Sequence, residues 1–234
     1  MTRQAFSGFA GFSTAAIEFL IELSENNERE WFKRHQDRYE AQVRGPALDF
    51  IRAMGPRLQK LSRHFVASDQ KVGGSMMRPQ RDTRFGADKT PYKTNVGIHF
   101  RHSVGKDVHA PGFYFHFDPA EVFLGAGMWH PDAPSLAAVR ERIKDKPKLL
   151  TKALEQADFK RWYELSGDSL KRPPAGVSAD HPMVEHLKRK DHIAIARLTH
   201  AQLCSPKLVE LVEARFVAAK PFVKFLCDAI EVPC

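Results

Sequence analysis

Residues 96–100 read Val-Gly-Ile-His-Phe and residues 113–117 read Phe-Tyr-Phe-His-Phe, and these two stretches decide the fold. In both, large apolar side chains alternate with glycine or with polar and amphipathic side chains. A period of two in aromatic and β-branched residues predicts strands that are buried on one face, most simply in an antiparallel sheet. Residues 121–124 and 192–198 predict two further strands, and Pro79 restricts a possible strand at residues 75–83 to an edge or a bulge.

Helical patterns precede and follow this predicted sheet. Apolar residues recur at helical spacing in residues 13–24, 27–43 and 46–61, and again in residues 135–144, 148–156, 180–189 and from 206 onward. Gly55-Pro56 predicts a kink or a break in the third helix, and Pro221 predicts a break in the last.

The order of these elements, helices then strands then helices, is typical of an α+β fold. We expect a single domain of residues 1–234. Its central, mainly antiparallel sheet is expected at about residues 65–130, with a further strand near residues 192–198. The sheet should pack against N-terminal and C-terminal helices.

Composition excludes several classes of protein. The chain has 234 residues, of which 43% are hydrophobic and 27% are charged, as in a water-soluble globular protein rather than a disordered, fibrous or membrane protein. No apolar stretch approaches the ~20 residues that span a bilayer, and the N-terminus lacks a signal-peptide pattern. The cysteines Cys204, Cys227 and Cys234 are not spaced as disulfide or metal-binding pairs. We therefore expect a cytoplasmic protein with no membrane partner.

The positive charge is concentrated in one part of the chain. The formal net charge is +8, and the segment from Lys71 to Lys106 alone carries +6, whereas residues 13–42 carry −3. The basic segment coincides with the predicted sheet and its connections. A basic region of this kind attracts anionic ligands or nucleic acid.

The centre of the basic segment is Arg-Asp-Thr-Arg-Phe-Gly-Ala-Asp-Lys-Thr-Pro-Tyr-Lys, residues 81–93. Gly86 and Pro91 predict a turn-rich loop that brings its lysines back toward its arginines. Arginine offers a planar fork of donors, lysine a point charge and tyrosine a hydroxyl donor, all of which suit a phosphate or a carboxylate. The candidate ligand-binding residues are therefore Arg81, Arg84, Lys89, Tyr92 and Lys93, joined by Asn27 and Arg29 from the acidic helices.

Two carboxylates lie among these cations. Asp82 and Asp88 could orient the guanidinium groups, or act as catalytic acid or base if one of their pKa values is raised. The alternative is a structural network, in which the charges of the loop pair with one another or with the acidic helices.

Several short motifs along the chain carry a resemblance to a known family. They are residues 26–32 with Tyr39, 71–74, 81–85 with 88–93, 125–129, 170–174 and 180–182. In these motifs the chain resembles an uncharacterised bacterial and fungal family, domain of unknown function 2461, and the resemblance runs from about Phe12 to Phe225. It implies no established activity, substrate or catalytic residue.

Other patterns predict no metal and no cofactor. The chain has 11 histidines, but no His-Glu-x-x-His motif and no spacing of a histidine and carboxylate triad. Gly125-Ala126-Gly127 lacks the rest of a dinucleotide-binding fingerprint, so a bulge or tight bend is expected there.

Two classes of function remain after these exclusions. The first is a basic pocket of Arg, Lys, Asp and Tyr that binds a phosphate- or carboxylate-bearing small molecule, and that belongs to an enzyme if the carboxylates take part. The alternative is a nucleic-acid-binding module that uses the basic sheet region, or a non-catalytic structural or interaction protein. We expect an anionic small molecule in preference to nucleic acid, because the basic residues are mixed with acids and a tyrosine.

Overall fold

The computed structural model describes residues 8–84, 88–104 and 110–234. These residues form a five-stranded sheet with the strand order β1-β2-β3-β5-β4, in which every pair of neighbouring strands is antiparallel. The predicted α+β fold with an antiparallel sheet is confirmed. The strands are β1 (Val96–Arg101), β2 (Gly112–Phe117), β3 (Val122–Met128), β4 (Glu164–Ser166) and β5 (His192–Leu198).

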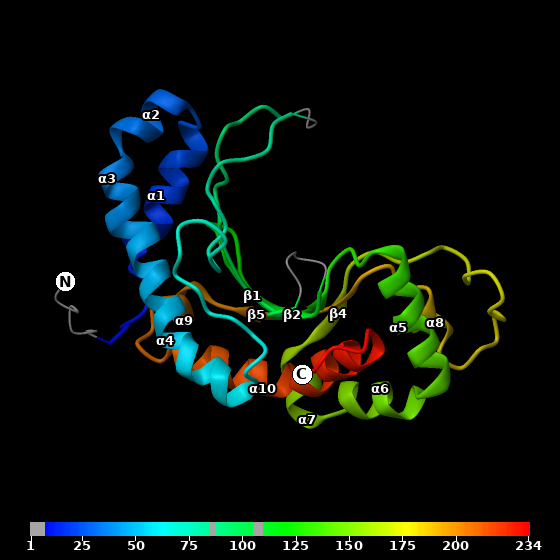
Figure 1. Ribbon diagram of the computed structural model, residues 1–234. Helices are drawn as coiled ribbons and strands as arrows, with labels where there is room; N and C mark the ends of the chain where they lie inside the picture. Colours follow the sequence, from blue (N-terminus) through cyan, green and yellow to red (C-terminus); the bar gives the residue numbers. More distant parts are fainter. Residues whose placement is uncertain (1–7, 85–87, 105–109) are drawn as a thin grey trace.

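One face of the sheet forms the core. The register pairs Phe115 with Ile98 on one side and with Leu124 on the other, and none of the three side chains is exposed. Two long helices cover this face, α4 (Gly45–Leu61) and α10 (Leu208–Ala229) (Figure 1). The Phe115 ring lies 4.7 Å from that of Phe50 in α4, so the alternation along β2 supplies the contact between sheet and helix.

The other helices lie at the two ends of this layer (Figure 1). At the N-terminal end α1–α3 rise beside the loop that connects α4 to β1. At the other end α5, α6 and α7 pack around the C-terminal half of α10, and α8 packs against α5. These helices are α1 (Thr14–Glu25), α2 (Arg29–Arg34), α3 (Gln36–Tyr39), a π-helical turn (Glu40–Arg44), α5 (Ala133–Asp145), α6 (Pro147–Leu154), α7 (Ala157–Trp162), α8 (Val184–Leu187) and α9 (His200–Leu203).

The helix predicted at residues 27–43 is divided into α2, α3 and the π-helical turn. His35 lies between α2 and α3 with φ −109° and ψ 16°, outside the helical region. Its Nδ1 lies 2.8 Å from the carbonyl oxygen of Trp31, which also accepts the backbone N–H of His35. The backbone N–H of His35 is shared between the carbonyls of Trp31 and Phe32, as at the end of a helix, and α3 begins at the next residue.

Neither internal proline interrupts its helix, so the predicted break at Pro221 is wrong. Helix α10 continues through Pro221 to Ala229, and α4 runs from Gly45 through Pro56 to Leu61. A proline at position 221 removes the hydrogen bond to the carbonyl of Val217. Since Val217 is 54% exposed, water can bond this carbonyl instead.

The possible strand at residues 75–83 does not form as a regular strand. Among the described residues of this segment, isolated bridges join Met76 to Ile98 and Gln80 to Tyr92. Three short elements, β4, α7 and α9, are present that the pattern did not predict. No helix in the described part of the chain has both the length and the apolar character needed to cross a membrane.

Candidate functional site

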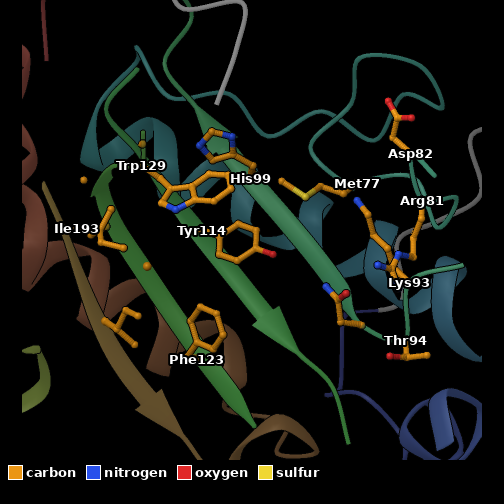
Figure 2. A pocket seen from close by; sticks show the side chains of 16 residues that line it. Met77, Arg81, Asp82, Lys93, Thr94, His99, Tyr114, Phe123, Trp129 and Ile193 are labelled. Carbon is orange, nitrogen blue, oxygen red and sulfur yellow. The ribbon is translucent and has the colours of Figure 1, made fainter. Parts of the chain in front are cut away.

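A cavity of about 700 Å³ lies on the open face of the sheet, opposite to α4 and α10 (Figure 2). Strands β1, β2, β3 and β5 form its floor, and the loop between α4 and β1 forms one wall. Its lining residues are Met77, Arg81, Asp82, Lys93, Thr94, Asn95, His99, Gly112, Tyr114, Phe123, Gly125, Ala126, Gly127, Trp129, Ile193 and Ile195.

Glycines in the strands leave room for this cavity. Tyr114 lies opposite Gly125, and Gly112 lies opposite Gly127, in the register of β2 and β3. A Cβ atom at Gly125 would lie 3.4 Å from the Cβ of Tyr114, and one at Gly97 would lie 2.4 Å from its hydroxyl oxygen. The Tyr114 ring therefore lies across the sheet, over positions that carry no side chain.

In the loop between α4 and β1, two backbone hydrogen bonds place the basic residues Arg81 and Lys93 along the cavity. Arg81 N donates to Pro91 O at 2.9 Å, and Lys93 N donates to Pro79 O at 2.7 Å, on either side of the bridge between Gln80 and Tyr92. Since side chains alternate along such a pair, Arg81 and Lys93 share one face and line the cavity. Tyr92 points to the other face, where its ring stacks on Phe32 at 4.1 Å.

Asn27 holds this loop against the N-terminal helices. Its side-chain amide donates to Tyr92 O at 2.9 Å and accepts from Tyr92 N at 3.0 Å. Both Asn27 and Tyr92, predicted to bind a ligand, thus take part in a contact inside the protein, and neither lines the cavity. Arg29 is exposed at the start of α2 and does not line it either.

Lys93 is half-buried, and its ammonium group has no acceptor among the residues that the structure describes. Burial lowers the pKa of Lys93, and the nearby positive charges of Arg78 and Arg81 lower it further. Arg81 has partners in Asp88 and Thr90. A buried cation that lacks a partner is costly, so this position favours the approach of an anion.

The outer part of the loop is internally paired. The Arg84 guanidinium donates to both Asp82 carboxylate oxygens, at 2.9 and 2.7 Å, and Lys89 Nζ donates to Thr83 O at 2.8 Å. Neither Arg84 nor Lys89 lines the cavity. The predicted turn at Gly86 lies outside the described residues.

The two candidate catalytic carboxylates differ in position but not in charge state. Asp82 lines the cavity, whereas Asp88 does not. The Arg84 side chain holds the pKa of Asp82 far below its usual range, and hydrogen bonds from Thr90 and then Arg81 lower the pKa of Asp88. A carboxylate with a lowered pKa holds no proton at neutral pH, so neither is prepared to act as an acid.

A chain of hydrogen bonds on β2 was missed by the sequence analysis. The Tyr114 hydroxyl lies 3.2 Å from His116 Nδ1, and His116 Nε2 lies 3.2 Å from Asp118 Oδ2. The signal was present in the strand pattern, because residues 114, 116 and 118 follow the period of two on the face opposite to the buried phenylalanines.

The side of the cavity away from Lys93 carries Trp129, which is 51% exposed (Figure 2). The next residue, His130, adopts a left-handed conformation with φ 48°, and its N–H donates to Asp191 Oδ1 at 2.7 Å. Asp191 Oδ2 also accepts from Asp168 N at 2.8 Å. This buried carboxylate stabilises the turn that places Trp129 beside the cavity.

His116, Asp118 and Glu121 offer ligand atoms within 4.8 Å of one another, a spacing that a metal ion could bridge. Asp118 Oδ1 already accepts two backbone N–H groups, and the Glu121 carboxylate pairs with Arg197 at 2.6 Å. Because these groups have partners within the protein, we assign no metal to them.

Comparison with known proteins gives one match. No curated protein and no solved structure is similar enough to this chain to count as a match. Residues 15–225, nearly the whole chain, match the family described as "Conserved hypothetical protein (DUF2461)". The resemblance seen in the basic loop and its companion motifs is confirmed, and the chain belongs to the DUF2461 family.

Proposed function

We propose that the cavity binds a small molecule with a phosphate or carboxylate group at one end and an apolar or planar body. The anionic group contacts Lys93 and Arg81. The body lies on the sheet between Tyr114, Phe123 and Trp129. The free thiols of the cysteines suit a reducing compartment, and we place this activity in the cytoplasm.

The observation that carries the proposal is the half-buried ammonium group of Lys93, which faces a cavity and has no acceptor among the described residues. Arg78 and Arg81 add positive charge beside it. An anion placed here gains charge-assisted hydrogen bonds and offsets the cost of holding these cations close together. The rest of the lining is mostly apolar or aromatic, and a volume of about 700 Å³ is within the usual range for small-molecule sites.

The alternative is a nucleic-acid-binding module. Several exposed aromatic rings that stack on successive bases would support it, but Phe113, Phe115 and Phe117 are fully buried, and the exposed ring of Trp129 lies beside the cavity. In the outer loop the Arg84 guanidinium is occupied by Asp82. A concave site with cations at one end suits a small molecule better.

Calorimetric titration with phenyl phosphate, a phosphate on an aromatic ring, tests the proposal. The wild-type protein should bind it more tightly than it binds inorganic phosphate. Lys93→Met should weaken the binding by at least about tenfold, because one charge-assisted hydrogen bond is lost.

Lys89→Met provides a matched control, since Lys89 is in the same loop but its ammonium group already bonds Thr83 O. This variant should bind within about twofold of wild type. Equal losses in the two variants, or no binding by the wild-type protein, would exclude the proposed site. A second experiment tests the nucleic-acid alternative by measuring, with fluorescence anisotropy at low salt, the binding of a short DNA duplex. Tight binding that weakens steeply with added salt would favour that alternative.

A further inference from the structure

We propose that Tyr114, His116 and Asp118 form a catalytic triad, in which the Tyr114 hydroxyl is the nucleophile and the cavity transfers acyl groups from small carboxylic esters. This inference rests on the proposed cavity and adds a reaction to it. Tyr114 lines the cavity, and Figure 2 shows its hydroxyl directed to the side where Lys93 lies.

The spacing of the three groups is that of a nucleophile, its base and a residue that orients the base. Both links, from Tyr114 Oη to His116 Nδ1 and from His116 Nε2 to Asp118 Oδ2, measure 3.2 Å. These distances are at the upper end of the range for activated nucleophiles, and such contacts are often longer before a substrate binds.

A fourth residue defines which nitrogen of His116 carries the proton. Asn95 Nδ2 lies 3.4 Å from His116 Nδ1, and an amide nitrogen can only donate. His116 Nδ1 is therefore an acceptor, and Nε2 carries the proton that it donates to Asp118. In this tautomer the single lone pair of Nδ1 faces both donors, and the Tyr114 hydroxyl at 3.2 Å is the nearer one, so Nδ1 can receive its proton.

The base and its orienting carboxylate are held in place. The His116 ring stacks on Phe123 with 4.5 Å between centroids, and Asp118 Oδ1 accepts from Ala120 N at 2.7 Å and Glu121 N at 2.8 Å. Burial would raise the pKa of Asp118, but the hydrogen bonds from Glu121 N and His116 outweigh it and lower the pKa. Asp118 is thus ionised and can stabilise a protonated His116.

Burial raises the pKa of Tyr114 to about 12. At neutral pH the phenol therefore does not ionise beforehand. It needs a base that takes its proton while the new bond forms, and His116 is the group within reach.

The reaction has two balanced stages. In the first, Tyr114 Oη attacks the ester carbonyl carbon, its proton moves to His116 Nδ1, and the positive charge of Lys93 stabilises the oxyanion. The bond to the alcohol then breaks, the alcohol takes the proton from His116, and the acyl group remains on Tyr114. In the second stage water attacks the acyl-tyrosine, gives a proton to His116, and releases the carboxylic acid as Tyr114 regains its proton.

The test is acylation by 4-nitrophenyl acetate. The wild-type protein should release about one equivalent of 4-nitrophenolate in a rapid first phase, and peptide mass spectrometry should find the acetyl group on Tyr114. Tyr92 is an internal reference, because it is half-buried and stacked on Phe32. Tyr114→Phe keeps the ring, so the protein should fold and still bind phenyl phosphate while the rapid phase is lost.

Two variants separate a role in the reaction from a role in the fold. His116→Gly should lose the rapid phase, and imidazole added to the solution should restore acetylation of Tyr114. Asp118→Asn should slow acetylation by at least about tenfold, because the amide no longer holds the required tautomer. Imidazole should not restore the rapid phase in a protein that carries both His116→Gly and Tyr114→Phe.

Acetylation of Tyr114 no faster than that of Tyr92, or unchanged in His116→Gly, would overturn the triad. If phenyl phosphate binds and Tyr114 is not acetylated, the triad fails and the binding site stands. If Tyr114 is acetylated and phenyl phosphate does not bind, the triad stands and the proposed ligand class fails.

Discussion

The two faces of one sheet differ in what they do. On the face toward α4 and α10, the side chains of β2 are phenylalanines that are fully buried. On the other face the same strand carries Tyr114 and His116, and its neighbours carry glycines. Because side chains alternate along a strand, residues one position apart contribute to stability on one face and to a cavity on the other. The comparison implies that stability and binding can be changed separately.

The largest effect is expected from a pair of phenylalanines on opposite faces. Phe115→Ala should lower the free energy of unfolding by about 3–5 kcal/mol, because it leaves a cavity between the sheet and Phe50. Phe123→Ala, on the open face, should cost less than about 2 kcal/mol but weaken phenyl phosphate binding. Urea denaturation at equilibrium measures both, and equal losses of stability would contradict the division between the faces.

A second pair compares two glycines on β3. Gly127 has φ +123°, and a Cβ there would lie 2.0 Å from His192 O, whereas a Cβ at Gly125 meets Tyr114 at an ordinary 3.4 Å. Gly127→Ala should therefore destabilise the fold by at least about 2 kcal/mol, and Gly125→Ala by less than about 1 kcal/mol. Thermal denaturation of the two variants measures the difference. A Gly125→Ala protein as unstable as Gly127→Ala would contradict the claim that only Gly127 is required by its backbone conformation and close contact.

A third change acts on the hydroxyl of Tyr114 rather than on the fold. In Gly97→Ala the new Cβ would lie 2.4 Å from Tyr114 Oη, so the hydroxyl must move away from its place beside His116. We expect a folded protein in which the rapid phase with 4-nitrophenyl acetate falls by at least about tenfold. Retention of the full rapid phase in a folded Gly97→Ala protein would argue against the required geometry.

The smallest expected effect is on the stability of the ligand-free protein, which the charge of Lys93 lowers slightly. Its pKa in the folded protein lies below the ordinary value of 10.5. Between the folded and unfolded pKa values the unfolded chain binds more protons, so this residue's contribution to stability rises with pH in that window. Lys93→Met should therefore be slightly more stable than wild type at neutral pH, by roughly 2 °C in Tm.

The difference between the two proteins should shrink as the pH rises through the folded pKa of Lys93 and beyond 10.5, above which Lys93 loses its proton in the unfolded state as well. Melting curves recorded at intervals above neutral pH measure it. A Lys93→Met protein that is less stable than wild type at neutral pH would show that the ammonium group has a partner.

The fold could be predicted from the sequence more fully than the site. The alternation in residues 96–100 and 113–117 predicts the two strands and their buried face, because it depends only on local periodicity. The cavity depends on register instead, since Gly125 makes room only because it lies opposite Tyr114. Neither the composition nor the local pattern of a strand predicts that Gly125 pairs with Tyr114.

The pairing of residues also decides which cations of the basic loop, residues 81–93, reach the cavity. Arg81 and Lys93 share a face, and Tyr92 leaves it, because the chain pairs at Gln80 and Tyr92. A loop with the same composition but a bridge shifted by one residue would present the opposite set. The prediction that the loop binds an anion thus depends on one pairing that no local pattern encodes.

The central claim is that the open face of the sheet binds an anion at Lys93, and a crystal structure with phenyl phosphate tests it most directly. The account expects a phosphate oxygen within hydrogen-bond distance of Lys93 Nζ and the phenyl ring over Gly125, between Tyr114 and Trp129. A ligand ordered at Arg84 and Lys89 on the outer loop, or an empty cavity at a saturating concentration of phenyl phosphate, would contradict the account.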